Sequence, residues 1–249
     1  MNTGLVSVTF RRLAAEEIIR LSAECGLSGI EWGGDIHVPC GDLETARRVG
    51  EMTRAHGLKV ICYGSYCRLT DGEPLDELVN TARALGAPLI RVWAGRLGSA
   101  ASDETQRQEV IRNARKLSEL ADGLDITFEY HGNTLTDTAE SARKLLEETD
   151  RANVGCLWQP PVGMSAEACA EGIRVIAPYI RNIHVFSWNG TERLPLEEGA
   201  RKWKVCLEEI NKLPGGRSLM LEFVRNDDPE QLRTDAACLK RWAEKEFAK

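Results

Sequence analysis

Eight short runs of apolar and β-branched residues recur along the chain, and a longer amphipathic segment follows each of them. The runs occupy residues 5–10, 28–32, 59–63, 89–93, 126–131, 154–159, 183–187 and 219–224. In the segments between them, apolar residues recur at intervals of three and four, which is the spacing of a helix with one buried face. Neighbouring parallel strands need a helical crossover, so this alternation predicts a parallel sheet in an α/β fold.

The number of repeats favours a closed barrel. The repeat averages about 30 residues, so eight strand–helix units fill residues 1–249 as one domain of the usual (β/α)8 size. Four helical segments end on a glycine, where helices commonly turn into the left-handed conformation: Gly26, Gly57, Gly86 and Gly123. The rival fold, a doubly wound open sheet, usually has a glycine-rich loop after its first strand, whereas this chain reads Phe-Arg-Arg-Leu there. We therefore predict a single (β/α)8 TIM barrel.

The charge of the chain limits its partners. The net charge is −6 and the isoelectric point is near 5.4, whereas nucleic acids and anionic membranes attract basic surfaces. The N-terminus lacks the pattern of a signal peptide, and no apolar stretch approaches the roughly 20 residues that span a bilayer. Eight cysteines in so long a chain are typical of reduced thiols. We expect a cytoplasmic protein with a small-molecule substrate and no nucleic-acid or membrane partner; a homo-oligomer is left open.

Polar residues interrupt the apolar runs where the last four strands end. They are Glu129, Gln159, His184 and Glu222. In a (β/α)8 barrel the C-terminal ends of the strands meet at one face, where catalytic groups lie. Two carboxylates, an imidazole and an amide oxygen suit one divalent metal ion, such as Mn, Mg, Co or Zn. The alternative is a set of buried polar residues that hydrogen bonds satisfy.

Strand alternation supports the same site. Successive side chains of a strand face opposite sides, so Met220 and Glu222 should point into the barrel, and Leu219, Leu221 and Phe223 at the helices. The same count turns two further sets of side chains inward: Glu129 with His131, and His184 with Phe186 and Trp188.

Several residues near the strand ends are candidates for binding substrate. They are His37, Arg91, Trp93, His131, Trp188 and Arg225. Indole rings stack well on the C–H faces of sugars, and alternation turns Trp93 and Trp188 towards a pocket but Trp32 and Trp158 towards the helices.

The two arginines have competing interpretations. Arg91 shares inward parity with Trp93, so it either binds substrate hydroxyls or pairs with Glu31 inside the barrel. Arg225 follows the last strand, where it either meets an anionic group or lies solvated at the surface.

The chain resembles the sugar phosphate isomerase/epimerase family, whose members have the xylose isomerase-like barrel and include ketose 3-epimerases and hydroxypyruvate isomerases. The resemblance runs through GIEWGGDIHVP, FEYHGNTLTDTAES and the final LEFV. In that family the metal is held by a Glu ending strand five, an acid on strand six, a His on strand seven and a Glu on strand eight. By position the resemblance implies four metal ligands, Glu129, Gln159, His184 and Glu222, and it implies Glu129 and Glu222 as the acid–base pair.

The sixth strand departs from the family pattern. The family commonly has Asp there, often with a His three residues on, whereas this chain has Gln159 and Val162. A Gln carbonyl can bind a metal but brings no charge, so we expect weaker binding of a hard ion. The missing His also removes a basis for transferring the substrate of the ketose epimerases.

The leading hypothesis is a metal-dependent isomerase or epimerase acting on a small sugar or keto-sugar, through carboxylate-mediated proton transfer at an enediolate. The same chemistry serves a lyase or dehydratase that acts by β-elimination on an oxidised sugar or glycoside. A sugar-binding relative without activity is a third reading. The endonuclease IV relatives share the barrel but need several zinc ions and a basic groove, which four histidines and an acidic balance argue against.

Overall fold

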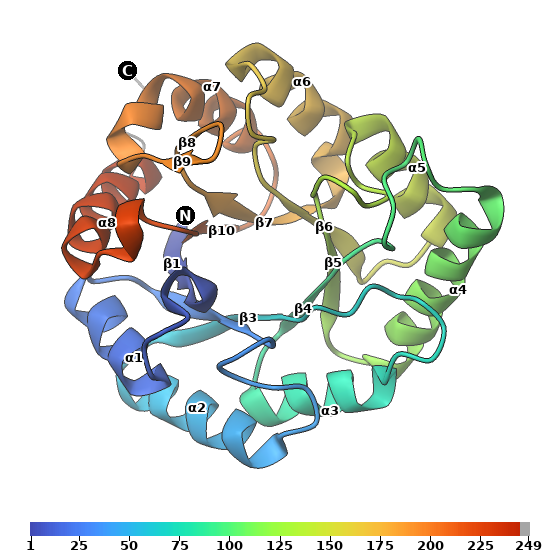
Figure 1. Ribbon diagram of the computed structural model, residues 1–249, viewed down its shortest axis with the longest axis horizontal. Helices are drawn as coiled ribbons and strands as arrows, with labels where there is room; N and C mark the ends of the chain where they lie inside the picture. Colours follow the sequence, from blue (N-terminus) through green and yellow to red (C-terminus); the bar gives the residue numbers. More distant parts are fainter. Residues whose placement is uncertain (245–249) are drawn as a thin grey trace.

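Eight parallel strands close into a barrel in the computed structural model, which describes residues 1–244 (Figure 1). Around the barrel the order is β1-β10-β7-β6-β5-β4-β3-β2, so each strand lies beside its neighbour in the chain and the last barrel strand closes on the first. The strands are β1 (Asn2–Val6), β2 (Gly29–Gly33), β3 (Lys59–Gly64), β4 (Leu89–Val92), β5 (Asp125–Glu129), β6 (Val154–Trp158), β7 (Ile180–Val185) and β10 (Ser218–Leu221). The predicted (β/α)8 barrel is confirmed, and the open-sheet rival is wrong.

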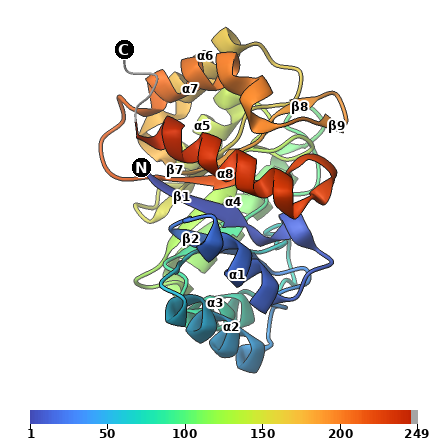
Figure 2. The same cartoon turned by 90° about the vertical axis from the view of Figure 1, so that its left-hand side faces the viewer.

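Within residues 1–244, eight α-helices form the outer layer of the barrel (Figures 1 and 2). They are α1 (Ala15–Glu24), α2 (Leu43–Ala55), α3 (Leu75–Leu85), α4 (Glu104–Leu120), α5 (Ala139–Thr149), α6 (Ala166–Ile176), α7 (Ala200–Ile210) and α8 (Pro229–Ala243). The glycines predicted to end four helices all have positive φ, between 65° and 80°. Residues with a side chain are strained in this left-handed conformation, whereas glycine adopts it freely. The glycines in the sequence therefore predicted where these helices end.

Apolar side chains fill two regions, one on each side of the barrel wall. The larger lies between the strands and the helices and contains Leu219 and Leu221. The smaller fills the inside of the barrel and contains Val6, Val8, Ile61, Cys62, Leu89 and Met220. Inner and outer residues therefore alternate along β10 as predicted. Because side chains fill the inside of the barrel, a site has room only at the face where the strands have their C-terminal ends.

The structure differs from the predicted elements at the first strand and after β7. The first strand stops at Val6, and Ser7–Phe10 forms a 3₁₀ helix. The hydroxyl of Ser7 accepts a hydrogen bond from the Gly33 backbone N–H at 2.8 Å. A side chain therefore takes the place of the backbone hydrogen bond that would continue the pairing of β1 with β2. A short hairpin, β8 (Trp188–Asn189) and β9 (Glu192–Arg193), follows β7 and was not predicted.

The cysteines are free, as expected. All eight lie within the described residues, and none forms a disulfide. Among the helices of residues 1–244, none is both long and apolar enough to cross a membrane.

Candidate metal centre

Three of the predicted metal ligands meet at the C-terminal end of the barrel. Glu129 ends β5, His184 lies near the end of β7, and Glu222 directly follows β10. One ligand atom from each lies within 4.8 Å of the others, and all three side chains are buried. Glu222 keeps its place beside His184 because its backbone N–H still bonds to Val185 at 3.1 Å, one step beyond the strand.

Gln159 is part of the cluster, but as a hydrogen-bond donor. Its amide nitrogen donates to Oε1 of Glu129 at 3.1 Å, and the side chain is buried. The amide nitrogen, not the oxygen, therefore faces the carboxylate. Gln159 would have to turn its amide before its oxygen could bind a metal ion, so its role as a ligand stays a prediction.

A second carboxylate lies behind His184. Glu31, on β2, is fully buried, and its Oε2 lies 3.0 Å from Nε2 of His184. The other ring nitrogen, Nδ1, lies 3.4 Å from Oε2 of Glu222 and has no hydrogen-bond partner in the described part of the chain. Metal-binding histidines usually give their other N–H to a carboxylate, which fixes the ring. A buried, unbonded imidazole nitrogen between two carboxylates fits a divalent ion.

Arg91 joins the two acidic groups of the centre. Its guanidinium lies 3.3 Å from Oε1 of Glu31 and 2.5 Å from Oε2 of Glu129, and it is 3% exposed. Of the two interpretations of Arg91, the internal pair with Glu31 is present, and the contact with Glu129 comes in addition. Burial by itself would lower the pKa of Arg91, but Glu129 and Glu31 outweigh burial and raise that pKa. The guanidinium therefore stays charged.

The charges at the centre leave room for a divalent cation. The centre contains three carboxylates, those of Glu31, Glu129 and Glu222, and one guanidinium, that of Arg91, which pairs with the first two. When His184 is neutral, two negative charges are left uncompensated. The carboxylate of Glu31 therefore offsets the acid that is missing at position 159. Burial alone would raise the pKa of Glu31, but His184 and Arg91 outweigh burial and lower that pKa.

His184 makes metal binding depend on pH. Burial would lower the pKa of its imidazole, but Glu31 and Glu222 outweigh burial and raise the pKa to about 10. Without metal, the ring is therefore protonated at neutral pH, and a ligand nitrogen must first lose that proton. We expect Mn²⁺ to release about one proton per ion at neutral pH, and its affinity to rise about tenfold per pH unit below the pKa. Titration calorimetry in two buffers of different ionisation enthalpy measures this, and a pH-independent affinity would contradict it.

A cavity of about 550 Å³ opens above the centre. Arg91, Glu129, Gln159 and Glu222 lie in its wall together with aromatic side chains, namely Tyr66, Trp93, Tyr130, His131, Phe186, Trp188 and Phe223. The rings of Trp93 and His131 are 4.4 Å apart, and those of Trp188 and Phe223 are 5.7 Å apart. Trp93, Trp188 and His131 thus lie where strand alternation placed them. Such a wall suits the C–H faces of a sugar-like ring.

Two predicted substrate contacts do not reach this cavity. His37 is buried away from it, with Nδ1 3.0 Å from the Ser7 hydroxyl and Nε2 3.3 Å from the Leu13 carbonyl. Arg225 is exposed in a 3₁₀ turn after the last strand and is absent from the cavity wall. Of the two interpretations of Arg225, the structure fits the solvated one.

The direction predicted for Phe223 is wrong. Its φ of 59° breaks the strand alternation, and its ring turns into the cavity wall and not towards the helices. The Thr9 hydroxyl holds this turn by accepting a hydrogen bond from the Phe223 backbone at 3.0 Å. A bulky residue with positive φ is strained, and such strain concentrates at functional sites.

Sequence reasoning missed Tyr66 and Arg11 in the cavity wall. Tyr66 follows the third strand and stacks on Trp93 with ring centres 6.3 Å apart. Arg11 follows the first strand and donates to the Tyr66 hydroxyl at 2.7 Å. Their position just beyond strand ends was the available signal, since loops at this face carry the site residues of a barrel.

Comparison with known proteins agrees with this architecture. The chain matches the xylose isomerase-like TIM barrel family over residues 19–242. It is similar to a 3-dehydroshikimate dehydratase from Bacillus anthracis, with 25% identity over 245 residues, covering 84% of this chain and 87% of that protein.

Solved structures of the same fold include two enzymes of different reaction types. One is the probable 3-DHS dehydratase AsbF from Bacillus anthracis, with a TM-score of 0.81 and 22% identity over 96% of this chain and 99% of that one. The other is the D-psicose 3-epimerase from Clostridium cellulolyticum H10, with a TM-score of 0.71 and 14% identity over 98% of each chain. At these identities the likeness establishes the fold.

Proposed function

The chain belongs to the xylose isomerase-like TIM barrel family, and from this we propose that it removes a proton beside a carbonyl group of a sugar or sugar-like substrate. One divalent metal ion would be held by Glu129, His184 and Glu222. The observation that carries the proposal is the buried cluster of these ligand atoms within 4.8 Å, at the floor of an aromatic cavity. Once bound, a divalent ion supplies polarisation of the carbonyl, which acidifies the neighbouring C–H.

Glu222 is the better of the two candidate bases. Both oxygens of Glu129 are engaged, Oε2 with Arg91 at 2.5 Å and Oε1 with Gln159 at 3.1 Å. Glu222 lies 3.4 Å from His184 and has no such pair of partners among residues 1–244. A carboxylate held by a guanidinium is a poor proton acceptor, since protonation would cost it that interaction. We therefore assign proton removal to Glu222.

This asymmetry favours β-elimination. Glu222 takes the proton from the carbon beside the carbonyl, a C=C bond forms, and the leaving hydroxyl departs as water after receiving a proton. His131 is the candidate donor, because it lines the cavity and, among the residues that the structure describes, only its Nδ1 is bonded, to the Gly132 carbonyl at 2.7 Å. Similarity to a 3-dehydroshikimate dehydratase supports the same reaction class.

Isomerisation or epimerisation is the second candidate. It needs a second group to return the proton on the other side, and Glu129 lies as near the centre as Glu222 does. This route would require Glu129 to leave Arg91, which is the reason we place it second.

The two reactions are separable in deuterium oxide. The Mn²⁺-loaded protein would be incubated with 3-dehydroshikimate, 3-keto-glucosides and ketohexoses. The products would be analysed by mass spectrometry and NMR spectroscopy. Elimination yields an unsaturated product that has lost water or an aglycone, whereas epimerisation yields an isomer that carries deuterium. Binding of these compounds without either product would leave a sugar-binding role and overturn the proposal.

A further inference from the structure

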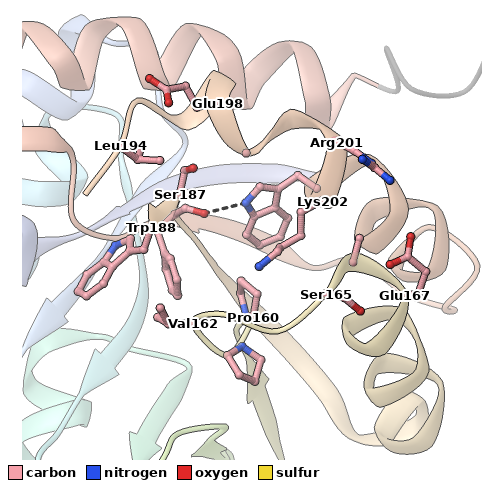
Figure 3. A pocket seen from close by; sticks show the side chains of 15 residues that line it. Pro160, Val162, Ser165, Glu167, Ser187, Trp188, Leu194, Glu198, Arg201 and Lys202 are labelled. Atoms are coloured by element: carbon pink, nitrogen blue, oxygen red, sulfur yellow. Dashed lines mark hydrogen bonds between the residues drawn. The ribbon is translucent and has the colours of Figure 1, made fainter. Parts of the chain in front are cut away.

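A second cavity adjoins the mouth of the barrel (Figure 3). This side cavity has a volume of about 380 Å³ and lies between the loop after β6 and the start of α7. It shares a wall with the cavity above the metal centre, formed by Pro160, Pro161, Val162, Phe186 and Trp188. The two cavities are therefore neighbours that these residues line in common.

Lys202 supplies a positive charge inside the side cavity. Its ammonium points into the side cavity, towards Pro160 (Figure 3). The side chain is half-buried, and among the described residues it has no ion pair or hydrogen bond. A partly desolvated ammonium without a counter-charge is unfavourable, and an anion would relieve it.

Ser187 adds an unused hydrogen-bond donor. It is only 8% exposed and lines the side cavity, yet its hydroxyl has no hydrogen-bond partner within residues 1–244. The hydroxyl is therefore free to donate to an acceptor that enters the side cavity. Ser187 follows β7 by two residues, so the barrel itself fixes its position.

The other charged side chains lie at the edge of the side cavity. Glu167, Glu198 and Arg201 are exposed, and Figure 3 shows them around its rim. Exposed charges are screened by water, so they contribute little to the interior. Of the four charged side chains that line the side cavity, Lys202 is the one that is not exposed.

From Lys202, Ser187 and the shared wall, we propose that the side cavity binds an anionic substituent of the substrate, a carboxylate or a phosphate. The reacting carbons would lie at the metal centre, a point that rests on the proposed function. Trp188 and the prolines would contact the carbon skeleton between the two. The substrate class is then an acidic sugar derivative, either a sugar acid or a sugar phosphate.

The test compares neutral and anionic probes on the Mn²⁺-loaded protein. Titration calorimetry would measure glucose, glucuronate and glucose 6-phosphate, and the anionic probe that binds more tightly identifies the group. We expect at least one anionic probe to bind about tenfold more tightly than glucose, and Lys202→Met to abolish that preference. Ser187→Ala should reduce it about threefold and covers the case in which Lys202→Met fails to fold.

Lys204→Met is the matched control, because Lys204 lies on the same helix, is exposed and is absent from the side-cavity wall. An equal loss of anion affinity in Lys202→Met and Lys204→Met, or no preference for anions in the wild type, would overturn the inference. Anion preference that depends on Lys202, without proton exchange by any substrate, would keep the side-cavity site and refute the proposed function. Proton exchange in the wild type, with no effect of Lys202→Met on anion affinity, would keep the proposed function and refute the side-cavity site.

Discussion

Glu222→Gln is expected to slow exchange of the substrate C–H proton with solvent by about a thousandfold, because the amide cannot accept the proton. Glu222 is the carboxylate of the centre that neither Arg91 nor Gln159 engages, so no neighbour can take over its role at the same position. The amide oxygen can still face the metal, and binding of substrate should change much less than turnover. Deuterium incorporation, followed by NMR, measures the rate.

Two controls make the result specific to Glu222. Glu230→Gln alters an exposed carboxylate at the start of α8 and should leave the exchange rate unchanged. Metal content and affinity for the substrate, measured on Glu222→Gln itself, separate loss of the base from loss of the site. Exchange within about threefold of the wild-type rate would rule out Glu222 as the base.

Arg91→Met is expected to lower the free energy of unfolding of the metal-free protein by about 3–5 kcal/mol. The substitution keeps the bulk of the side chain but leaves Glu31 and Glu129 buried without their shared cation. Urea unfolding followed by Trp fluorescence measures the loss. Mn²⁺ should recover part of it, because a divalent cation would restore positive charge beside Glu129.

The control for Arg91 is Arg143→Met. Arg143 pairs with Glu147 on the exposed face of α5, where an ion pair contributes at most about 1 kcal/mol. Arg91→Lys keeps one charge and should lose less stability than Arg91→Met, which gives a second measurement if the Met variant does not fold. A loss below about 1 kcal/mol for Arg91→Met would contradict the role of Arg91 as the cation of the centre.

The sequence predicted the parts of the site that follow from strand periodicity. Glu129 and His184 lie on regular strands, so alternation and the convergence of strand ends placed them together. Glu222 lies one residue beyond β10 but keeps the strand's hydrogen bond to Val185, so the same count held for it. The glycine helix ends followed from a local backbone requirement in the same way.

Features that depend on departures from regular strands were beyond this reasoning. Phe223 turns into the cavity because Thr9, more than two hundred residues away in sequence, holds its backbone at positive φ. The side cavity needs the hairpin region after β7 and the start of α7 to lie beside the loop after β6, which no periodicity encodes. A pair between Arg91 and Glu31 was one of the two interpretations of Arg91, whereas its bond to Glu129 depends on the rotamer that it adopts across the barrel.

The metal content of the protein, purified without added metal and measured by elemental analysis, is the most direct test of the centre. Glu129, His184 and Glu222 predict roughly one equivalent of a divalent ion per chain, or stoichiometric uptake of Mn²⁺ on titration. The variant His184→Ala should lose that binding. Less than about a tenth of an equivalent, with no uptake of added Mn²⁺, would contradict a metal centre at the mouth of this barrel.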